Sequence, residues 1–211
     1  MSLSLDHFFI ITSPGAPQAK LLSNIGLVEG SSNDHPGQGT ANRRFYLANS
    51  TIELIYLRDI NEAQNGPGQQ LHFAERSDNT SASPFGLVVR AGLGATQMPF
   101  KGWRYYPDYF SKDWFFQIGQ NSNTLEEPLC ICMPLQLSRP KRQTENPDWY
   151  LTKISISVPT TQPSSILQHV TQCSDISLEL NRPHQLELTF NNACQSKTVN
   201  LQPELPMVIH W

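Results

Sequence analysis

The first sixty residues alternate between short apolar runs and polar turns, and this pattern constrains the fold more than any other part of the chain. Five segments have the periodicity of regular structure: a strand at 4–12, a helix at 16–25, a short strand at 27–29, and a hairpin of two strands at 42–47 and 51–57. Gly26 is well placed to end the helix. A polar, Gly-rich loop at 30–41 precedes the hairpin. The predicted order is therefore strand, helix and three strands.

A similar order, with one strand more, is predicted near the C-terminus. Its strand at 150–158 is followed by a helix at 162–172 and by four short strands at 176–180, 185–190, 197–201 and 207–211. A supersecondary unit that recurs along a chain is stronger evidence for a fold than any single motif. We therefore expect an α+β protein in which repeated βαβββ modules form a curved mixed sheet around a cleft.

Four regions follow from this prediction. The first module covers 1–60, a polar linker covers 61–83, an irregular middle module rich in aromatic residues covers 84–149, and the C-terminal module covers 150–211. Within the linker, residues 70–75 fit a short helix. In the middle module, strands are predicted at 84–90, 114–118 and 129–133. All four regions are expected to form one globular unit.

Charge and composition argue against two classes of partner. The 211 residues include 15 Lys and Arg against 18 Asp and Glu, a net charge of -3, and the basic residues form only isolated clusters at 43–44 and 139–142. A nucleic-acid-binding protein usually carries a basic stripe. No run reaches the ~20 apolar residues that cross a bilayer, and Asp6 and His7 interrupt the apolar run that a signal peptide would need. We expect a soluble cytoplasmic protein that binds neither nucleic acid nor membrane.

The four cysteines fit buried thiols better than a metal site. Cys130 and Cys132 form a C-x-C pair, which a strand would place on one face. Such a pair can bind a metal, but no second C-x-x-C or His pair completes a zinc set. Cys173 and Cys194 stand alone in the sequence.

Two ionisable side chains lie in the apolar strands of the first module. His7 belongs to the first predicted strand and Glu53 to the last. Burying either group is costly without a partner, so we expect both to face a partly enclosed space on one concave face. Imidazole and carboxylate are ligands for Zn²⁺, Mn²⁺, Fe²⁺ or Ni²⁺. The alternative is a hydrogen-bonded pair without metal, in which Glu53 is the catalytic general base.

The loop that leads into the hairpin is a second candidate. Two glycines let its backbone turn tightly and approach a ligand closely. His35, Gln38, Thr40 and Asn42 could then contact the carbonyl or carboxylate of a substrate. Alternatively, these side chains bond the backbone of their own loop.

The aromatic segment at 100–116 is a third candidate. Trp103 and its aromatic neighbours could wall a pocket for an apolar or planar ligand, and core packing is the alternative. Gln117 is a polar residue in an apolar strand, and it could contact a ligand or a metal.

Three segments of the first module resemble a known family. They are the Leu-Asp-His start at 5–7, the His-Pro-Gly-x-Gly-Thr-x-Asn run at 35–42 and the Ile-Glu-Leu-Ile strand at 52–55. Together they look like a glyoxalase-like domain of the vicinal oxygen chelate superfamily. The motifs cover about the first quarter of the chain, and beyond residue 84 the resemblance rests on the strand pattern.

The resemblance implies a metal site with one departure. In that superfamily, paired βαβββ modules surround a cleft that typically holds a divalent metal, which would be Zn, Mn, Fe or Ni here. His7 matches the ligand of the first strand and Glu53 that of the fourth strand. In the second module Phe85 stands where a histidine is expected. Further ligand candidates are Gln117, Glu179, Glu187 and His210.

The resemblance also implies a function. The chain would act on or bind a small carbonyl, hydroxy-acid or aromatic compound in the cleft between modules, as a lyase, an isomerase or a dioxygenase-like metalloenzyme. A bound metal would act as a Lewis acid. Two alternatives stay open: a non-catalytic, metal-free binding protein of the resistance type, or a degenerate module whose own side chains fill the cleft. Relatives often pair modules across chains, so a homodimer is a further expectation.

Overall fold

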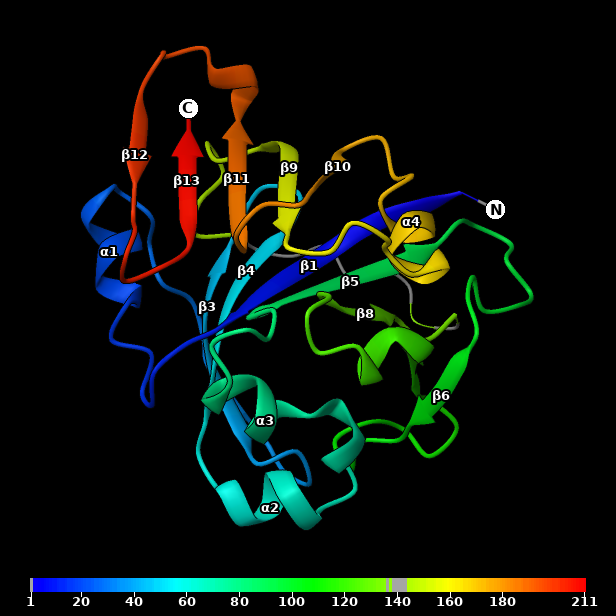
Figure 1. Cartoon of the computed structure of the whole chain (residues 1–211). Helices are drawn as coiled ribbons and strands as arrows, with labels where there is room; N and C mark the ends of the chain where they lie inside the picture. The colour runs from blue at the N-terminus through cyan, green and yellow to red at the C-terminus, as the bar shows by residue number, and fades with distance from the viewer. Residues whose placement is uncertain (1, 136, 138–143) are drawn as a thin grey trace.

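The computed structural model describes residues 2–135, 137 and 144–211, so the basic cluster at 139–142 lies outside the described residues. The larger of its two sheets has eight strands in the order β2-β3-β4-β1-β5-β8-β7-β6. Their bounds are β1 (Leu3–Ile11), β2 (Asn33–His35), β3 (Thr40–Tyr46), β4 (Thr51–Leu57), β5 (Phe85–Ala91), β6 (Gly102–Tyr105), β7 (Phe116–Gly119) and β8 (Leu129–Cys132). The sheet is strongly curled into a half-barrel (Figure 1), so the predicted α+β class and curved mixed sheet are confirmed.

The eight strands are arranged similarly on both sides of the central pair. β1 and β5 are antiparallel to each other. β1 pairs in parallel with β4 on one side, and β5 pairs in parallel with β8 on the other. Antiparallel strands then follow outward on each side. A helix, α1 (Ala19–Asn24), follows β1, whereas no helix lies between β5 and β6 within the described chain.

The C-terminal region forms a separate sheet of five strands in the order β10-β9-β11-β13-β12. Its elements are β9 (Leu151–Val158), α4 (Ser165–Val170), β10 (Ile176–Leu180), β11 (Gln185–Phe190), η3 (Asn191–Ala193), β12 (Thr198–Asn200) and β13 (Met207–His210). The predicted order of elements is present, but the strand arrangement of the first sixty residues is not repeated. Here α4 joins two parallel neighbours, β9 and β10, because a crossover helix can return the chain directly beside the strand that it leaves.

The convex face of the half-barrel packs against the C-terminal sheet. Phe8 of β1 and Phe85 of β5 share one apolar core with Ile156 of β9, and none of these side chains is exposed. α1 and α4 cover the same core through Leu22 and Leu167. This layer leaves the concave face free for a site.

A β-bulge in β1 shifts the alternation of its side chains between the two faces of the sheet. The pairing of β1 with β5 shifts between Leu5 and His7. Strict alternation predicted that Leu5, His7 and Phe9 share a face, but Leu5 packs in the convex core while His7 and Phe9 face the concave side. The extra residue is Asp6, and such bulges redirect side chains beside functional sites.

Residues 61–83, predicted to be a linker, form short helices that pack against one end of the half-barrel (Figure 1). These helices are α2 (Ile60–Asn65), η1 (Gln69–Leu71) and α3 (Phe73–Asp78). The Asp59 side chain caps α2 by accepting from the Glu62 backbone N–H. Leu71 and Phe73 are buried in the apolar core of the concave face, and this burial explains why the segment is ordered rather than a free connection.

Two smaller predictions are also corrected. Residues 27–29 are not a strand, and the short strand β2 forms instead inside the predicted loop. The aromatic segment that lacked periodicity contains β6, and η2 (Gln120–Asn123) follows β7. Within the described residues, no helix has the length and apolar character needed to cross a membrane.

Candidate small-molecule site

A cavity of about 470 Å³ lies on the concave face of the eight-stranded sheet. Its volume falls in the range of known small-molecule sites. Its apolar wall consists of Phe9, Ile55, Leu71, Phe73, Val88, Phe110, Phe116, Ile118, Ile131 and Met133. Its polar lining consists of His7, Asn33, Asp34, His35, Gln38, Arg44, Glu53, Tyr105 and Tyr109. The cavity therefore brings together four residues singled out from the sequence: His7, His35, Gln38 and Glu53.

His7 is oriented by the carboxylate that precedes it. Its Nδ1 lies 2.7 Å from Asp6 Oδ1. Asp6 is completely buried, and burial alone would raise its carboxyl pKa, but the hydrogen bonds and charges of His7 and Arg90 outweigh burial and hold the pKa far below its ordinary value. Asp6 therefore holds the Nδ1 side of the His7 ring, which leaves Nε2 on the other side of the ring. No described residue bonds to that Nε2.

Arg90 holds Asp6 from the opposite strand. Its Nε donates to Asp6 Oδ2 in a short charge-assisted hydrogen bond, and its Nη1 donates to the carbonyl of Leu137 at 2.5 Å. Arg90 lies on β5, 84 residues further along the chain than Asp6. The bulge in β1 thus brings a buried ion pair against His7 and fixes the direction of its ring.

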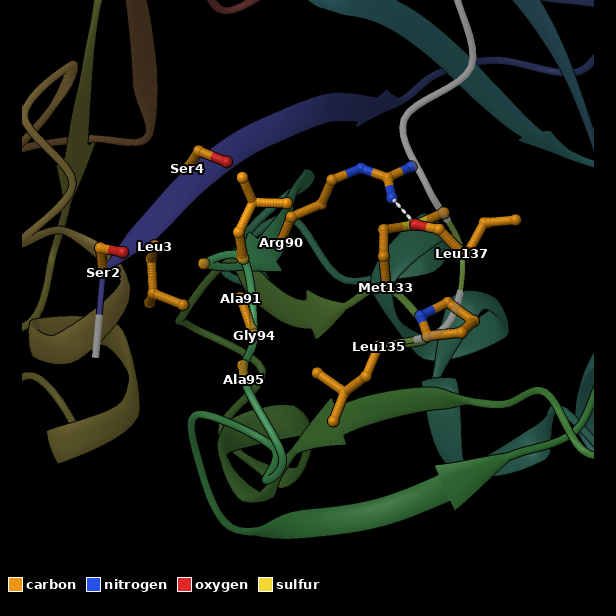
Figure 2. Close-up of a pocket in the computed structure, with 13 residues that line it drawn as sticks. Ser2, Leu3, Ser4, Arg90, Ala91, Gly94, Ala95, Met133, Leu135 and Leu137 are labelled. Carbon is orange, nitrogen blue, oxygen red and sulfur yellow. Dashed lines mark hydrogen bonds between the residues drawn. The ribbon is translucent and has the colours of Figure 1, made fainter.

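Arg90 also belongs to the wall of a second cavity, of about 620 Å³ (Figure 2). That cavity lies between the start of β1, the end of β5 and the segment after β8. The figure shows the Arg90 side chain extending past the cavity to the carbonyl of Leu137. Arg90 is the single charged side chain in the described lining, and its hydrogen bonds already serve Asp6 and Leu137. We therefore place the candidate chemistry in the first cavity.

Glu53 projects from β4 beside His7. It pairs in register with Phe9 of β1, so His7 is its diagonal neighbour on the same face. Glu53 is half-buried, and within the described chain no hydrogen bond or ion pair reaches its carboxylate. His7 and Glu53 therefore share a face as predicted, but they do not form the hydrogen-bonded pair that was the alternative to a metal site.

His35 is held at both ring nitrogens. The Asn42 side-chain Oδ1 accepts from the Asn33 backbone N–H at 2.8 Å, which directs Asn42 Nδ2 at His35 Nε2, 3.3 Å away. His35 Nδ1 then carries the proton and donates to Thr40 Oγ1 at 2.9 Å. Burial lowers the pKa of His35, and the negative charge of Glu53 offsets this only in part. His35 is thus a neutral histidine at the cavity wall.

Thr40 and Asn42 do not line the cavity. Thr40 is completely buried and accepts from Gln38 Nε2 at 2.7 Å as well as from His35. His35 and Gln38 thus line the cavity, while Thr40 and Asn42 lie behind them and bond to their side chains.

Trp103 and Gln117 lie away from the cavity. The indole N–H of Trp103 is 3.4 Å from Ser122 Oγ, and the ring packs edge-on against Tyr105 at 6.1 Å. Gln117 points to the opposite face of β7, where its amide lies 3.5 Å from the carbonyl of Phe100. Alternation along β7 places Phe116 and Ile118, rather than Gln117, against the cavity.

Tyr105 is one of the aromatic residues that the sequence suggested as the wall of a pocket. It is 2% exposed, lines the cavity, and its hydroxyl has no hydrogen-bond partner. Burial raises the pKa of this phenol to about 12, with smaller contributions from Asp108 and Glu62. The aromatic segment was recognised as a pocket wall, but periodicity could not distinguish Tyr105 from Trp103, which lies two residues earlier on the same strand.

Phe85 is not the counterpart of His7 on β5. It lies in the convex core on the other side of the sheet. The residue of β5 that pairs directly with Phe9 on the concave face is Gly86. A Cβ at Gly86 would overlap the ring of Phe9, so that ring fills the space in which a β5 ligand would lie.

The residues present do not fit a divalent metal. His7 and Glu53 are the inner donors of the cavity, and Asp34 lies at its rim, where its side chain is 62% exposed and 3.7 Å from Arg58. Catalytic zinc sites generally use three protein ligands. His35 cannot complete the set because both of its nitrogens are engaged. Among the described residues there is no group of three or more His, Cys, Asp or Glu side chains that could hold a metal ion. Glu179, Glu187 and His210, also considered as ligands, belong to the separate C-terminal sheet.

The cysteines are free thiols, and three of them are buried as expected. Burial raises the pKa of Cys130 to about 12 and that of Cys132 to about 11. Cys173 is also buried, while Cys194 is exposed. Both cysteines of the C-x-C pair point into the convex core, which agrees with a packing role.

Comparison with known proteins supports the fold and is silent on the chemistry. No protein-family model and no curated protein matches the chain. A solved structure of a hypothetical protein from Staphylococcus aureus is similar over 100% of this chain and 99% of that chain, with a TM-score of 0.64 and 10% identity. A hypothetical protein from Bacillus halodurans C-125 matches 69% of this chain and 100% of its own, with a TM-score of 0.40 and 17% identity. The first of these shows a shared fold alone.

Proposed function

We propose that the protein is glyoxalase-like and binds a small organic compound in the concave cavity without a protein-bound metal. One observation carries the proposal. Three residues that line a largely apolar cavity carry polar groups with no partner in the described chain: His7 at Nε2, Glu53 at its carboxylate and Tyr105 at Oη. The Tyr105 hydroxyl is buried as well, and buried polar atoms in native proteins are nearly always satisfied. A ligand that bonds to these atoms would account for their orientation.

The strand arrangement supports the glyoxalase-like part of the proposal. On this view β1 and β4 belong to one module, and β5 and β8 are their counterparts in the second. Each pair is parallel, and the two pairs meet at the antiparallel β1–β5 contact. The residues equivalent to His7 and Glu53 are then Gly86 and Ile131, because Gly86 and Val88 occupy the concave positions of β5 and Val88 pairs with Ile131. Neither can ligate a metal, which favours the metal-free, resistance-type alternative.

A ligand screen tests the proposal. Unfolding temperature would be measured in the presence of a chelator, with a panel of small carbonyl, hydroxy-acid and aromatic compounds. A compound that binds only the folded state raises that temperature. A compound that binds in the cavity should no longer raise the unfolding temperature of Ile131→Phe, in which a larger side chain on β8 narrows the cavity. It should still raise the unfolding temperature of Leu93→Phe, a control on an exposed turn. A panel without a single hit, or hits that ignore Ile131→Phe, would count against the proposal.

The Asp6–His7 pair favours a second function, in which the bound compound also undergoes proton transfer. A buried carboxylate that fixes the imidazole tautomer is the arrangement that general bases use. His7 would accept a proton from the ligand at Nε2. Replacing His7 with Gln would then abolish turnover of a hit compound, while its binding would fall much less. Equal losses of turnover and binding would argue for a purely binding role.

A further inference from the structure

The described lining of the cavity carries more acidic than basic side chains. Its described lining contains two carboxylates, Asp34 and Glu53, and one guanidinium, that of Arg44. Asp34 lies at the rim, where its side chain is 62% exposed and 3.7 Å from Arg58. Glu53 lies further in, between the imidazoles of His7 and His35 and the apolar wall.

Arg44 does not neutralise Glu53. The two residues are direct cross-strand neighbours, but the Arg44 guanidinium is engaged elsewhere. Its Nε donates to the Ser31 carbonyl at 2.7 Å, its Nη2 donates to Ser31 Oγ at 3.0 Å, and it lies 5.0 Å from the centroid of the Tyr46 ring. No ion pair with Glu53 is formed within 4.0 Å. The Glu53 carboxylate therefore faces the cavity without an ion pair to any described residue.

The two inner polar groups leave positions open to a ligand. Asp6 holds His7 Nδ1, so Nε2 is the His7 nitrogen that remains, and Glu53 presents a carboxylate. A half-buried carboxylate without donors is costly, and a ligand that brings both a positive charge and N–H donors would offset that cost. An ammonium group has both properties.

The apolar part of the cavity fits the remainder of such a ligand. Phe110 and Phe116 pack at 4.7 Å between ring centroids, and Phe9 and Phe73 pack at 5.8 Å. Aromatic rings accept a planar apolar body, and their faces also attract a nearby cation. Tyr105 also lines the cavity, and its buried hydroxyl has no hydrogen-bond partner in the described chain.

We infer that the ligand of this cavity is an arylalkylamine, whose protonated nitrogen is bound by Glu53 and His7 and whose ring packs against the phenylalanine wall. This inference rests on the proposed function, since it names the class of compound that the same cavity takes. An oxygen substituent on the ligand's ring could accept a hydrogen bond from the Tyr105 hydroxyl.

Three compounds of similar size test the inference: phenethylamine, 2-phenylethanol and 3-phenylpropionate, which share a phenylethyl body and differ in charge. Their dissociation constants would be measured by isothermal titration calorimetry on the full chain. We expect the amine to bind about tenfold or more tightly than the alcohol, as a charge-assisted hydrogen bond allows. In Glu53→Gln, the dissociation constants of the amine and the alcohol should lie within about twofold of each other. Glu204→Gln, which removes the same charge from an exposed turn, should leave the difference unchanged.

Other results would overturn the inference. Tighter binding of 3-phenylpropionate would mean that Arg44 or Tyr105, rather than Glu53, selects the ligand. An amine preference that survives Glu53→Gln would place the amine outside this cavity. Binding by none of the three would exclude simple arylalkylamines, and the wider compound panel then decides separately whether the cavity binds any small molecule. His7→Asn provides an independent variant, and it should also weaken the amine more than the alcohol.

Discussion

The ring of Phe9 lies across the central strand pair on top of Gly86, its direct partner on β5. This contact joins the two halves of the half-barrel at the floor of the cavity. It leaves no room for a side chain at Gly86, and the β5 residue that pairs with His7 is the apolar Val88. The cavity is therefore asymmetric: its polar groups come mainly from the first half of the sheet, and β5 and β8 provide apolar wall.

Gly86→Ala should destabilise the protein by about 1–3 kcal/mol, because a methyl group here overlaps the Phe9 ring and forces it to move. Urea unfolding of Gly86→Ala, of Phe9→Leu and of the double variant Phe9→Leu/Gly86→Ala would measure the coupling energy between the two positions. The double variant should lose less stability than the two single changes added together. Additive losses would mean that Phe9 does not occupy the space above Gly86.

Asp6→Asn should cost about 3–5 kcal/mol at pH 7, because it leaves the Arg90 guanidinium buried without its carboxylate. The folded pKa of Asp6 is depressed, so its stabilisation is fully present above the unfolded value of 3.8 and is lost as the pH falls below it. The stability difference between wild type and Asp6→Asn should therefore be constant from pH 5 to 7 and shrink below about pH 4. Asp113→Asn, on an exposed loop, serves as the control. A difference that does not change with pH would contradict the assignment of Asp6 as an ionised partner of Arg90.

Asn42→Asp should raise the pKa of His35. In the wild type, burial keeps this pKa below 6.5, so protonation of the unfolded chain lowers stability as the pH falls below 6.5. An aspartate at position 42 keeps the acceptor for the Asn33 N–H but presents a carboxylate to His35 Nε2, which favours the imidazolium. An NMR titration of the His35 ring protons would show the shift. An unchanged pKa would mean that Asn42 does not contact the ring in solution.

Tyr105→Phe should leave the free protein as stable as the wild type or about 1 kcal/mol more stable, because it removes a buried hydroxyl that has no partner. The same change should weaken binding of any ligand that offers an acceptor to this hydroxyl. Tyr150→Phe, at a side chain that is 51% exposed, should affect neither property. Destabilisation by 1 kcal/mol or more would indicate that the Tyr105 hydroxyl has a partner within the protein.

Periodicity predicted most elements because their apolar spacing is regular. The strands at β1, β4, β5 and β9 were expected within one or two residues of their observed bounds. Periodicity gave the wrong face at the β-bulge of β1, because one inserted residue moves the side chains that precede it to the other face of the sheet. Leu5 was therefore misplaced, while His7 and Phe9, which follow the bulge, were assigned to the correct face.

Pairing between distant strands could not be predicted from spacing. The choice of Phe85 as the counterpart of His7 assumed an alignment one residue away from the observed register, in which Gly86 is the residue on the concave face. The C-terminal region has the expected elements, but its strand order depends on which strand α4 returns to. Both outcomes are set by tertiary packing.

In the site, too, local sequence pattern indicated some residues, and others depended on contacts between distant strands. His7, Glu53, His35 and Gln38 were recognised because polar residues in apolar strands or Gly-rich loops are unusual. Asp6 was noticed only as an interruption of an apolar run, since its partner Arg90 lies 84 residues away. The sequence already raised the question of a missing metal ligand at Phe85, and among the described residues no group of three or more His, Cys, Asp or Glu side chains forms a metal site.

Metal content tests the central claim most directly. The protein would be purified without tag or chelator, incubated with Zn²⁺, Mn²⁺, Fe²⁺ or Ni²⁺, desalted and analysed by mass spectrometry beside a His7→Ala/Glu53→Ala variant. A metal-free cavity predicts well below one equivalent of each metal, with no difference between the two proteins. Close to one equivalent in the wild type, lost in the double variant, would contradict the account and restore a metal-dependent glyoxalase-like mechanism.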